Sequence, residues 1–208
     1  MAHRYLLVLR FALVNVVAIA LLAAIYLQGW LDGLTDRMTL ILCGVVFSVF
    51  IYGLILCGAK IWRTSVDLND LRSGAAAPGS RAEKYLALAN GNDAESRSIN
   101  IGNLRLKLSH NIGIVRQIAN SLVFLGLIGT VIGFIIALSG VDPQATAQAD
   151  NVAAMVSTLI RGMSVALYTT LVGAVLNVWL TVNHRILATG TLNLFSAIVQ
   201  SGETGGTA

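Results

Sequence analysis

Charged residues are scarce in this sequence of 208 residues, where Asp, Glu, Lys and Arg together make up only 12%. A soluble domain carries about 25% charged residues, so the chain lacks half of the usual solvating surface. Hydrophobic residues account for 56% of the chain, and the mean hydropathy is +0.76. This balance excludes an ordinary soluble domain and predicts an integral membrane protein.

Residues that bind metals or carry out redox chemistry are equally scarce. The sequence holds three His and two Cys, and no pair of them has metal-ligand spacing. The common nucleotide-binding, serine-hydrolase and zinc-protease motifs are absent. Cys43 and Cys57 would lie about 21 Å apart on one helix, too far for a disulfide bond. We therefore expect no metal site, no cofactor and no enzymatic activity.

Four apolar stretches are long enough to cross a bilayer, whose core of about 30 Å needs roughly 20 residues of helix. They cover residues 11–30, 39–59, 118–140 and 160–182. The first follows two arginines, as a signal peptide would. It is longer than the apolar part of such peptides, however, and no clear cleavage site follows it, so we expect a retained helix. The sequence predicts an all-α membrane protein with four transmembrane helices.

The basic residues favour one orientation of these helices. With four spans, both termini and the middle segment lie on one side, which carries twelve Lys and Arg residues, while the other side carries only Arg37 and Arg161. Basic residues accumulate on the cytoplasmic side, so we expect both termini to be cytoplasmic. The net charge of +4 follows from this topology and does not indicate binding to nucleic acid.

The chain divides into four expected segments. They are two lipid-facing outer helices, a cytoplasmic helical segment, the third and fourth spans, and a cytoplasmic helix with a disordered tail, over residues 1–59, 60–117, 118–182 and 183–208. In the cytoplasmic segment, amphipathic patterns extend the second and third helices beyond the membrane. A turn-rich stretch and a short helix over residues 81–89 separate them. We expect disorder from Ser201 onward.

Small residues form a stripe along each of the last two spans. The third span carries Gly126, Thr130, Gly133, Ala137 and Gly140, and Gly129 forms a GxxxG pair with Gly133. The fourth carries Gly162, Ala166, Thr170, Gly173, Asn177 and Thr181, with Thr169 beside the stripe. Small residues let membrane helices approach closely, so the stripes predict a tight seam. Packing alone explains the glycines as well as a channel does. Asn177, Thr181 and His184 are expected to form hydrogen bonds at the interface rather than to bind a ligand.

Two threonines lie at matching depth in these stripes. The midpoints of the third and fourth spans fall at residues 129 and 171, next to Thr130 and Thr170. Each hydroxyl could simply bond to its own helix. Their matching depth favours a polar step in an ion pathway. None of the ten Asp and Glu residues lies inside a span, although proton-driven proteins need an intramembrane group that takes up and releases the ion. A partner would have to supply that group.

The segment Leu125–Gly133, LGLIGTVIG, resembles the first signature of the MotA/TolQ/ExbB proton-channel family. The run Gly162–Gly173 resembles the second signature, which has a threonine and a glycine midway along the last span. The order, spacing and depth of the motifs agree over about residues 112–185. The resemblance implies a stator-type subunit of an ion-driven motor in the bacterial inner membrane. A pentamer of this chain would surround a dimeric single-span partner of the MotB, TolR or ExbD type, which carries the ion-binding aspartate.

By the same resemblance, the third and fourth spans line the channel, Thr130 and Thr170 border the ion pathway, and Thr169 is a weaker candidate. The residues expected to pack around the channel are Gly126, Gly129, Gly133, Gly162, Ala166 and Gly173. Val165 stands where ExbB and TolQ carry a glutamate. Four spans resemble MotA, but the cytoplasmic segment is shorter than in flagellar stators, so the resemblance does not select a subfamily.

Two alternatives and several details stay open at this point. A non-conducting four-helix membrane scaffold explains the seam equally well. A transporter acting alone is disfavoured, because no span is interrupted by proline or charged at its centre. The sequence does not select proton or sodium as the ion. It also leaves open which process is driven: flagellar rotation, gliding, outer-membrane energisation, envelope maintenance or defence.

Overall fold

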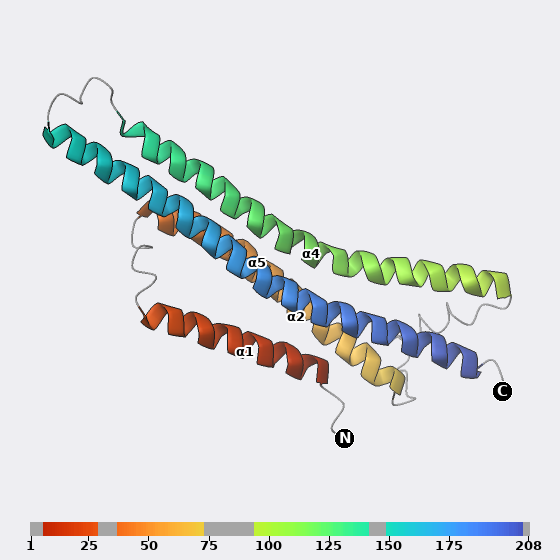
Figure 1. The fold of residues 1–208 in the computed structure, drawn as a ribbon. Helices are drawn as coiled ribbons and strands as arrows, with labels where there is room; N and C mark the ends of the chain where they lie inside the picture. The colour runs from red at the N-terminus through yellow and green to blue at the C-terminus, as the bar shows by residue number, and fades with distance from the viewer. Residues whose placement is uncertain (1–5, 29–36, 73–93, 142–148, 206–208) are drawn as a thin grey trace. The chain divides into compact units, whose positions relative to one another are not determined.

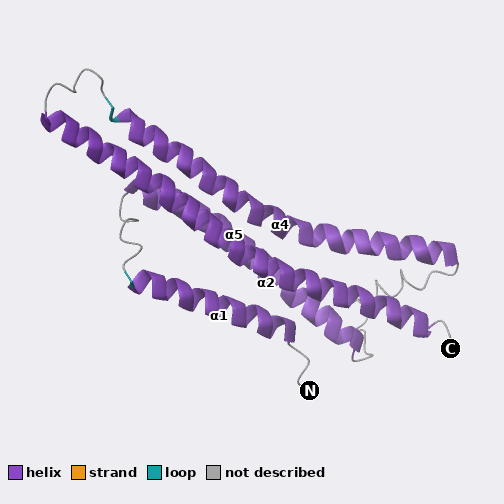
Figure 2. Ribbon diagram, viewed as in Figure 1, coloured by secondary structure: helices purple, strands orange, loops and turns teal. Residues whose placement is uncertain are grey.

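The computed structural model describes residues 6–28, 37–72, 94–141 and 149–205, and every element in these ranges is an α-helix (Figure 1, Figure 2). The helices are α1 over Leu6–Leu27, α2 over Arg37–Arg72, α4 over Ala94–Ser139 and α5 over Ala149–Gly205. The predicted all-helical class is therefore confirmed for the described residues.

All four helices are long and apolar enough to cross a membrane. Helix α4 has 46 residues and α5 has 57. At a rise of 1.5 Å per residue they measure about 69 Å and about 86 Å, more than twice the bilayer core of about 30 Å. Both helices are therefore much longer than a bilayer core requires.

Helix α5 extends further than the sequence predicted. It continues through residues 201–205, so the disorder expected from Ser201 is wrong for these five residues. Each residue added to an existing helix contributes a backbone hydrogen bond, which lets a long helix propagate into a polar sequence. The short helix expected over residues 81–89 lies outside the described residues.

The chain divides into two compact units, and parts of every helix occur in each. Unit 1 comprises Met1–Val16, Leu54–Arg116 and Val182–Ala208, and unit 2 comprises Val17–Gly53 and Gln117–Thr181. In unit 1 the three long helices share an apolar cluster of Leu104, Leu194 and Ile198, packed against Leu68, Leu108 and Phe195.

In unit 1, a polar contact links α1 to α5. The Asn15 side chain donates from Nδ2 to Oδ1 of Asn183 on α5 at 2.9 Å and to the Phe11 carbonyl at 2.7 Å. Leu7 lies against Gly190 of the same helix α5. No described residue of α1 is buried, which agrees with a helix that faces lipid.

In unit 2, α4 and α5 run side by side in opposite directions, and α2 packs against both (Figure 1). The rings of Phe50 on α2 and Trp179 on α5 lie 5.0 Å apart between centroids. A methyl group at Gly53 of α2 would meet Leu180 of α5 at 2.7 Å and Ile118 of α4 at 2.9 Å. Helix α2 therefore occupies one side of the α4–α5 pair.

Candidate functional site

The predicted seam between α4 and α5 is present in unit 2, and the two backbones come very close there. A methyl group at Gly133 would lie 2.6 Å from the Ala166 backbone nitrogen and 2.7 Å from the Gly162 carbonyl oxygen. A methyl group at Gly173 would lie 2.8 Å from the Leu122 carbonyl oxygen. Because the neighbouring atoms belong to the backbone, they cannot move aside. Glycine is therefore needed for this helix separation.

The other seam residues show the same close approach. A methyl group at Gly126 would lie 3.3 Å from the Thr170 Cα and 3.5 Å from the Gly173 Cα, and Gly129 faces the Thr169 side chain directly. The six residues predicted to pack the helices are all buried; they are Gly126, Gly129, Gly133, Gly162, Ala166 and Gly173. The structure thus brings all six together in one seam.

Thr169 lies at the centre of this seam. Its side chain is 0% exposed, and its hydroxyl donates within α5, to the Val165 carbonyl at 2.9 Å and the Ala166 carbonyl at 3.1 Å. A hydroxyl that bonds its own helix needs no partner from elsewhere. Thr169 therefore acts in this structure as a small packing residue against Gly129.

Thr170 is exposed, and its hydroxyl reaches across the seam. Oγ1 of Thr170 donates to the Gly126 carbonyl of α4 at 3.2 Å. The same carbonyl accepts the backbone N–H of Thr130 in the α-helical pattern. Oγ1 of Thr130 donates to the Leu127 carbonyl at 2.6 Å. The structure therefore brings the two predicted pathway threonines within about one helical turn of each other.

The threonines lie on the side of the α4–α5 pair that faces away from α2. Nine residues, or about two and a half turns, separate Thr170 from Trp179, so the two side chains project from opposite sides of α5. Trp179 contacts Phe50 of α2. Thr170 must therefore point away from α2, and Thr130 lies within a turn of it on α4.

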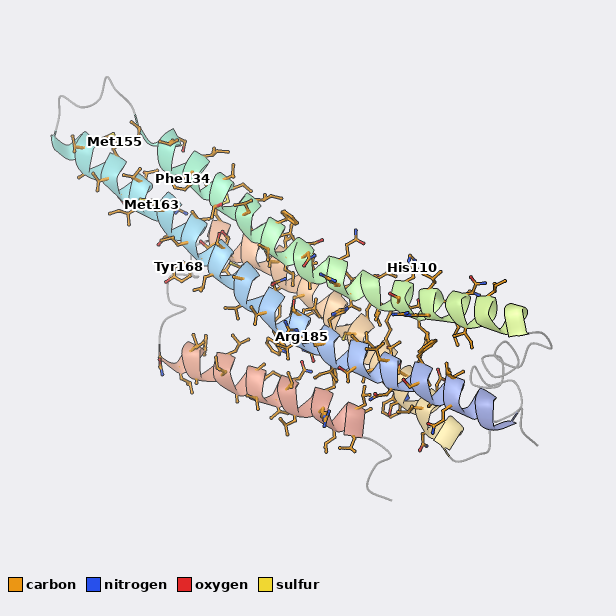
Figure 3. All side chains as sticks on the ribbon, turned by 45° about the vertical axis from the view of Figure 1, so that its right-hand side comes forward. His110, Phe134, Met155, Met163, Tyr168 and Arg185 are labelled. Carbon is orange, nitrogen blue, oxygen red and sulfur yellow. The ribbon has the colours of Figure 1, made fainter. Side chains whose placement is uncertain are left out.

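Large apolar side chains surround the two hydroxyls on this face. They stand three, four or seven positions from a threonine on the same helix, which places them on the same face. They are Leu127 and Phe134 on α4 and Met163 and Leu167 on α5, and all four are exposed (Phe134 and Met163 are labelled in Figure 3). The two hydroxyls thus form a polar step within an apolar wall.

The hydroxyl oxygens of Thr130 and Thr170, which form this polar step, can still accept hydrogen bonds. A threonine hydroxyl has one proton to donate and two lone pairs that accept. The protons of Thr130 and Thr170 are engaged by the Leu127 and Gly126 carbonyls. Their lone pairs can therefore accept a hydrogen bond from a protonated group or contact a cation. In the described parts of the chain, no three His, Cys, Asp or Glu residues are grouped so as to hold a metal ion.

Asn177 adds a second polar contact across the seam. Its Nδ2 donates to the Ala119 carbonyl of α4 at 2.6 Å. Asn177 and Thr170 are seven residues apart, as are Ala119 and Gly126, so the bond repeats the geometry of the threonine bond two turns further along. The prediction that Asn177 forms a hydrogen bond at the interface is confirmed.

A model of the MotA/TolQ/ExbB proton channel family matches residues 90–199. The matched range is slightly more than half of the chain and contains the seam, Thr130, Thr170 and Asn177. No curated protein and no solved structure matches the chain.

Proposed function

Because the chain belongs to the MotA/TolQ/ExbB proton channel family, we propose that it is the ring-forming subunit of an ion-driven motor in the bacterial inner membrane. Five copies would surround the transmembrane helices of a dimeric single-span partner. The observation that carries this proposal is the pair of hydroxyls, Thr130 and Thr170, which lie at one level of α4 and α5 with large apolar side chains around them.

The packing of the helices supports a particular arrangement in the ring. Helices α4 and α5 line the channel with the face that carries the threonines. Helix α2 belongs to the outer shell, since it packs on the opposite side of the pair through Phe50 and Trp179. Helix α1 belongs there too, because none of its described residues is buried. Both termini lie in the cytoplasm by the distribution of basic residues.

The partner supplies the group that carries the ion. None of the Asp and Glu residues of this chain falls within the four predicted spans. An aspartate of the partner, once protonated, is neutral and can pass the apolar wall that includes Leu127, Phe134 and Leu167. At the threonine step, the acceptor oxygens receive a hydrogen bond from the protonated carboxyl group or from a hydrated proton, or they contact a sodium ion. Each charge that crosses supplies about 2.3 kcal/mol per 100 mV of membrane potential to drive motion.

The substitution Thr170→Val tests this role because it keeps the side-chain volume and removes the hydroxyl. The complex with its partner is reconstituted in vesicles, and ion uptake is followed after a membrane potential is imposed. We expect uptake to fall roughly tenfold, while assembly persists because a hydrogen bond between membrane helices contributes only about 0.6 kcal/mol. Thr189→Val is the matched control, since Thr189 is exposed and bonds only to its own helix.

Native mass spectrometry of the same samples establishes the assembly. Five copies of the chain with two of the partner agree with the proposed motor. Normal ion uptake by an assembled Thr170→Val complex contradicts the role of the hydroxyl. A wild-type complex that assembles but moves neither protons nor sodium favours the alternative, a non-conducting scaffold, which the close seam at Gly133 and Gly162 also permits.

A further inference from the structure

Basic residues gather on α1 and α2 in unit 1, next to the predicted inner ends of the first two spans. Arg10 precedes the first span, and Lys60 and Arg63 follow the second span within about one helical turn. Helix α1 contains no Asp or Glu, and the first acidic residue of α2 is Asp67, a further turn away from the span. This boundary therefore carries positive charge on both helices and no negative charge.

Helices α1 and α2 pack together at this level. Both belong to unit 1 here, and a methyl group at Gly58 of α2 would lie 3.4 Å from the ring of Phe11 on α1. Arg10 lies one residue beyond Phe11 on the cytoplasmic side, and Arg63 lies five residues beyond Gly58. The two arginines thus differ in depth by four residues, or about 6 Å. One headgroup layer of a bilayer has a similar thickness.

The basic side chains of this boundary are not equally available. Lys60 donates its ammonium group to the Asn111 carbonyl of α4 and is thereby directed toward that helix. Arg10 and Arg63 are exposed, and among the described residues neither guanidinium has an ion-pair partner. A guanidinium group presents five N–H donors in a planar fork that matches the oxygens of a phosphate group. Arg10 and Arg63 are therefore suited to bind a phosphate from outside the chain.

Exposed apolar side chains accompany the two arginines. Trp62 is 58% exposed and stands one turn beyond Gly58, on the face of α2 that turns toward α1. Ile55 lies seven residues before Trp62 on the same face, in the direction of the span, and is 64% exposed. Tryptophan is enriched where acyl chains meet headgroups. The surface therefore matches a ligand that carries both a phosphate group and hydrocarbon chains.

We propose that Arg10 and Arg63 bind the phosphate group of an anionic phospholipid of the cytoplasmic leaflet, whose acyl chains lie along Trp62 and Ile55. This inference rests on the proposed function, which places α1 and α2 in the outer shell with these ends at the cytoplasmic face. Basic surfaces between transmembrane helices on that face bind anionic headgroups. Because no described residue of α1 is buried, a headgroup that bridges the two helices also holds α1 to the rest of the subunit.

Quenching of Trp62 fluorescence by brominated lipids tests this site. The chain has three tryptophans, so Trp30→Phe with Trp179→Phe leaves Trp62 as the reporter. The full chain is reconstituted in phosphatidylcholine vesicles that contain increasing fractions of phosphatidylglycerol or phosphatidylcholine brominated on the acyl chains. A basic residue near a membrane surface contributes about 1 kcal/mol to the attraction of anionic lipid, so each arginine should favour phosphatidylglycerol roughly fivefold.

Substitutions of the arginines separate a specific site from the overall charge. Arg10→Gln with Arg63→Gln should abolish the preference, and Arg10→Lys with Arg63→Lys should retain most of it. Arg105→Gln is the matched control, because Arg105 is exposed on α4 in unit 1. It stands thirteen residues before the third span, or about 20 Å, beyond the screening length of about 8 Å. The control should therefore keep the full preference.

A second measurement avoids the tryptophan substitutions. The wild-type complex with its partner is exposed to equal amounts of phosphatidylglycerol and phosphatidylcholine in gentle detergent, and native mass spectrometry identifies the lipid that it retains. We expect phosphatidylglycerol on the wild type and on Arg105→Gln, and its loss from the Arg10→Gln, Arg63→Gln variant.

Several results would overturn the lipid site. They are equal quenching by the two lipids, an equal loss of preference with Arg105→Gln, and release of the lipid by millimolar glycerol phosphate, which would make soluble phosphates the ligand. Absence of quenching by either lipid would place Trp62 away from the bilayer and overturn the site as well. Ion uptake by the complex decides the motor separately. Normal uptake without a lipid preference overturns the lipid site alone, and a lipid preference without any ion uptake overturns the motor alone.

Discussion

Helices α4 and α5 pack against each other in two chemically different ways. In unit 2 their contact consists of small residues, such as Gly133 against Ala166. In unit 1 the same two helices meet through large apolar side chains, among them Leu104 and Leu194. Both contacts are buried, yet they use side chains from opposite ends of the size range.

This difference is what the proposed topology predicts, with unit 2 in lipid and unit 1 in water. In water, burying a leucine side chain contributes about 1.5–3 kcal/mol. In lipid this gain disappears, because the acyl chains are as apolar as leucine, and helices instead associate through close contact between backbones. Along α4, unit 1 ends at Arg116 and unit 2 begins with the next residue. Along α5, unit 2 ends at Thr181 and unit 1 begins with the next residue. These positions agree with the predicted ends of the third and fourth spans at residues 118 and 182, which is where the proposed topology expects the packing to change.

The largest effect is expected from Gly133→Leu, which tests the small-residue contact. A methyl group at this position already approaches the Ala166 nitrogen to 2.6 Å, so a leucine must force the two backbones apart. We expect the assembled ring to be lost, as measured by native mass spectrometry. Gly44→Leu is the control, since no atom lies within 4 Å of a methyl group there. An intact ring with Gly133→Leu would show that the close approach is not required.

The second effect concerns the large-residue contact. Leu104 is 3% exposed, and Leu104→Ala should lower the free energy of unfolding by about 2–5 kcal/mol through lost burial and a cavity. Thermal unfolding in detergent measures the change, with Leu106→Ala as the control because Leu106 is 69% exposed. Equal effects of the two substitutions would contradict the idea that this part of α4 is stabilised by apolar burial.

Much of this arrangement could be predicted from the sequence, but the rotation of the helices could not. The recurrence of small residues at three- and four-residue spacing identified the seam. Thr169 and Thr170 differ by only about 100° around α5, and both are small hydroxyl residues, so composition alone cannot show which of them is buried. The spacing placed Thr170 in the stripe and Thr169 beside it, and the structure corrects this: Thr169 is buried in the seam and Thr170 is exposed.

Contacts between residues far apart in the sequence could not be predicted from the sequence pattern either. Asn15 and Asn183 are separated by 168 positions, and no periodicity links them, yet their side chains hydrogen-bond. The register that pairs Asn177 with Ala119 and Thr170 with Gly126 likewise depends on how far α4 and α5 are shifted along each other in unit 2. The shift of one helix along the other is fixed where the glycines meet the facing backbone, and this fit exists only once the two helices have packed together.

The smallest effect is expected from removing a buried threonine hydroxyl, and it is compared between unit 2 and unit 1. Thr39 of α2 in unit 2 is 0% exposed, and among the described residues its Oγ1 has no hydrogen-bond partner. Thr191 of α5 in unit 1 is also buried, but its Oγ1 donates to the Leu187 carbonyl at 2.9 Å. An unsatisfied buried polar group costs about 1–3 kcal/mol, so Thr39→Val should raise the free energy of unfolding by about 1 kcal/mol, whereas Thr191→Val should lower it slightly or leave it unchanged. Thermal unfolding of the two variants in parallel measures both changes. A loss of stability with Thr39→Val would mean that the hydroxyl is bonded in the assembled protein, so that a polar contact compensates for its burial on α2.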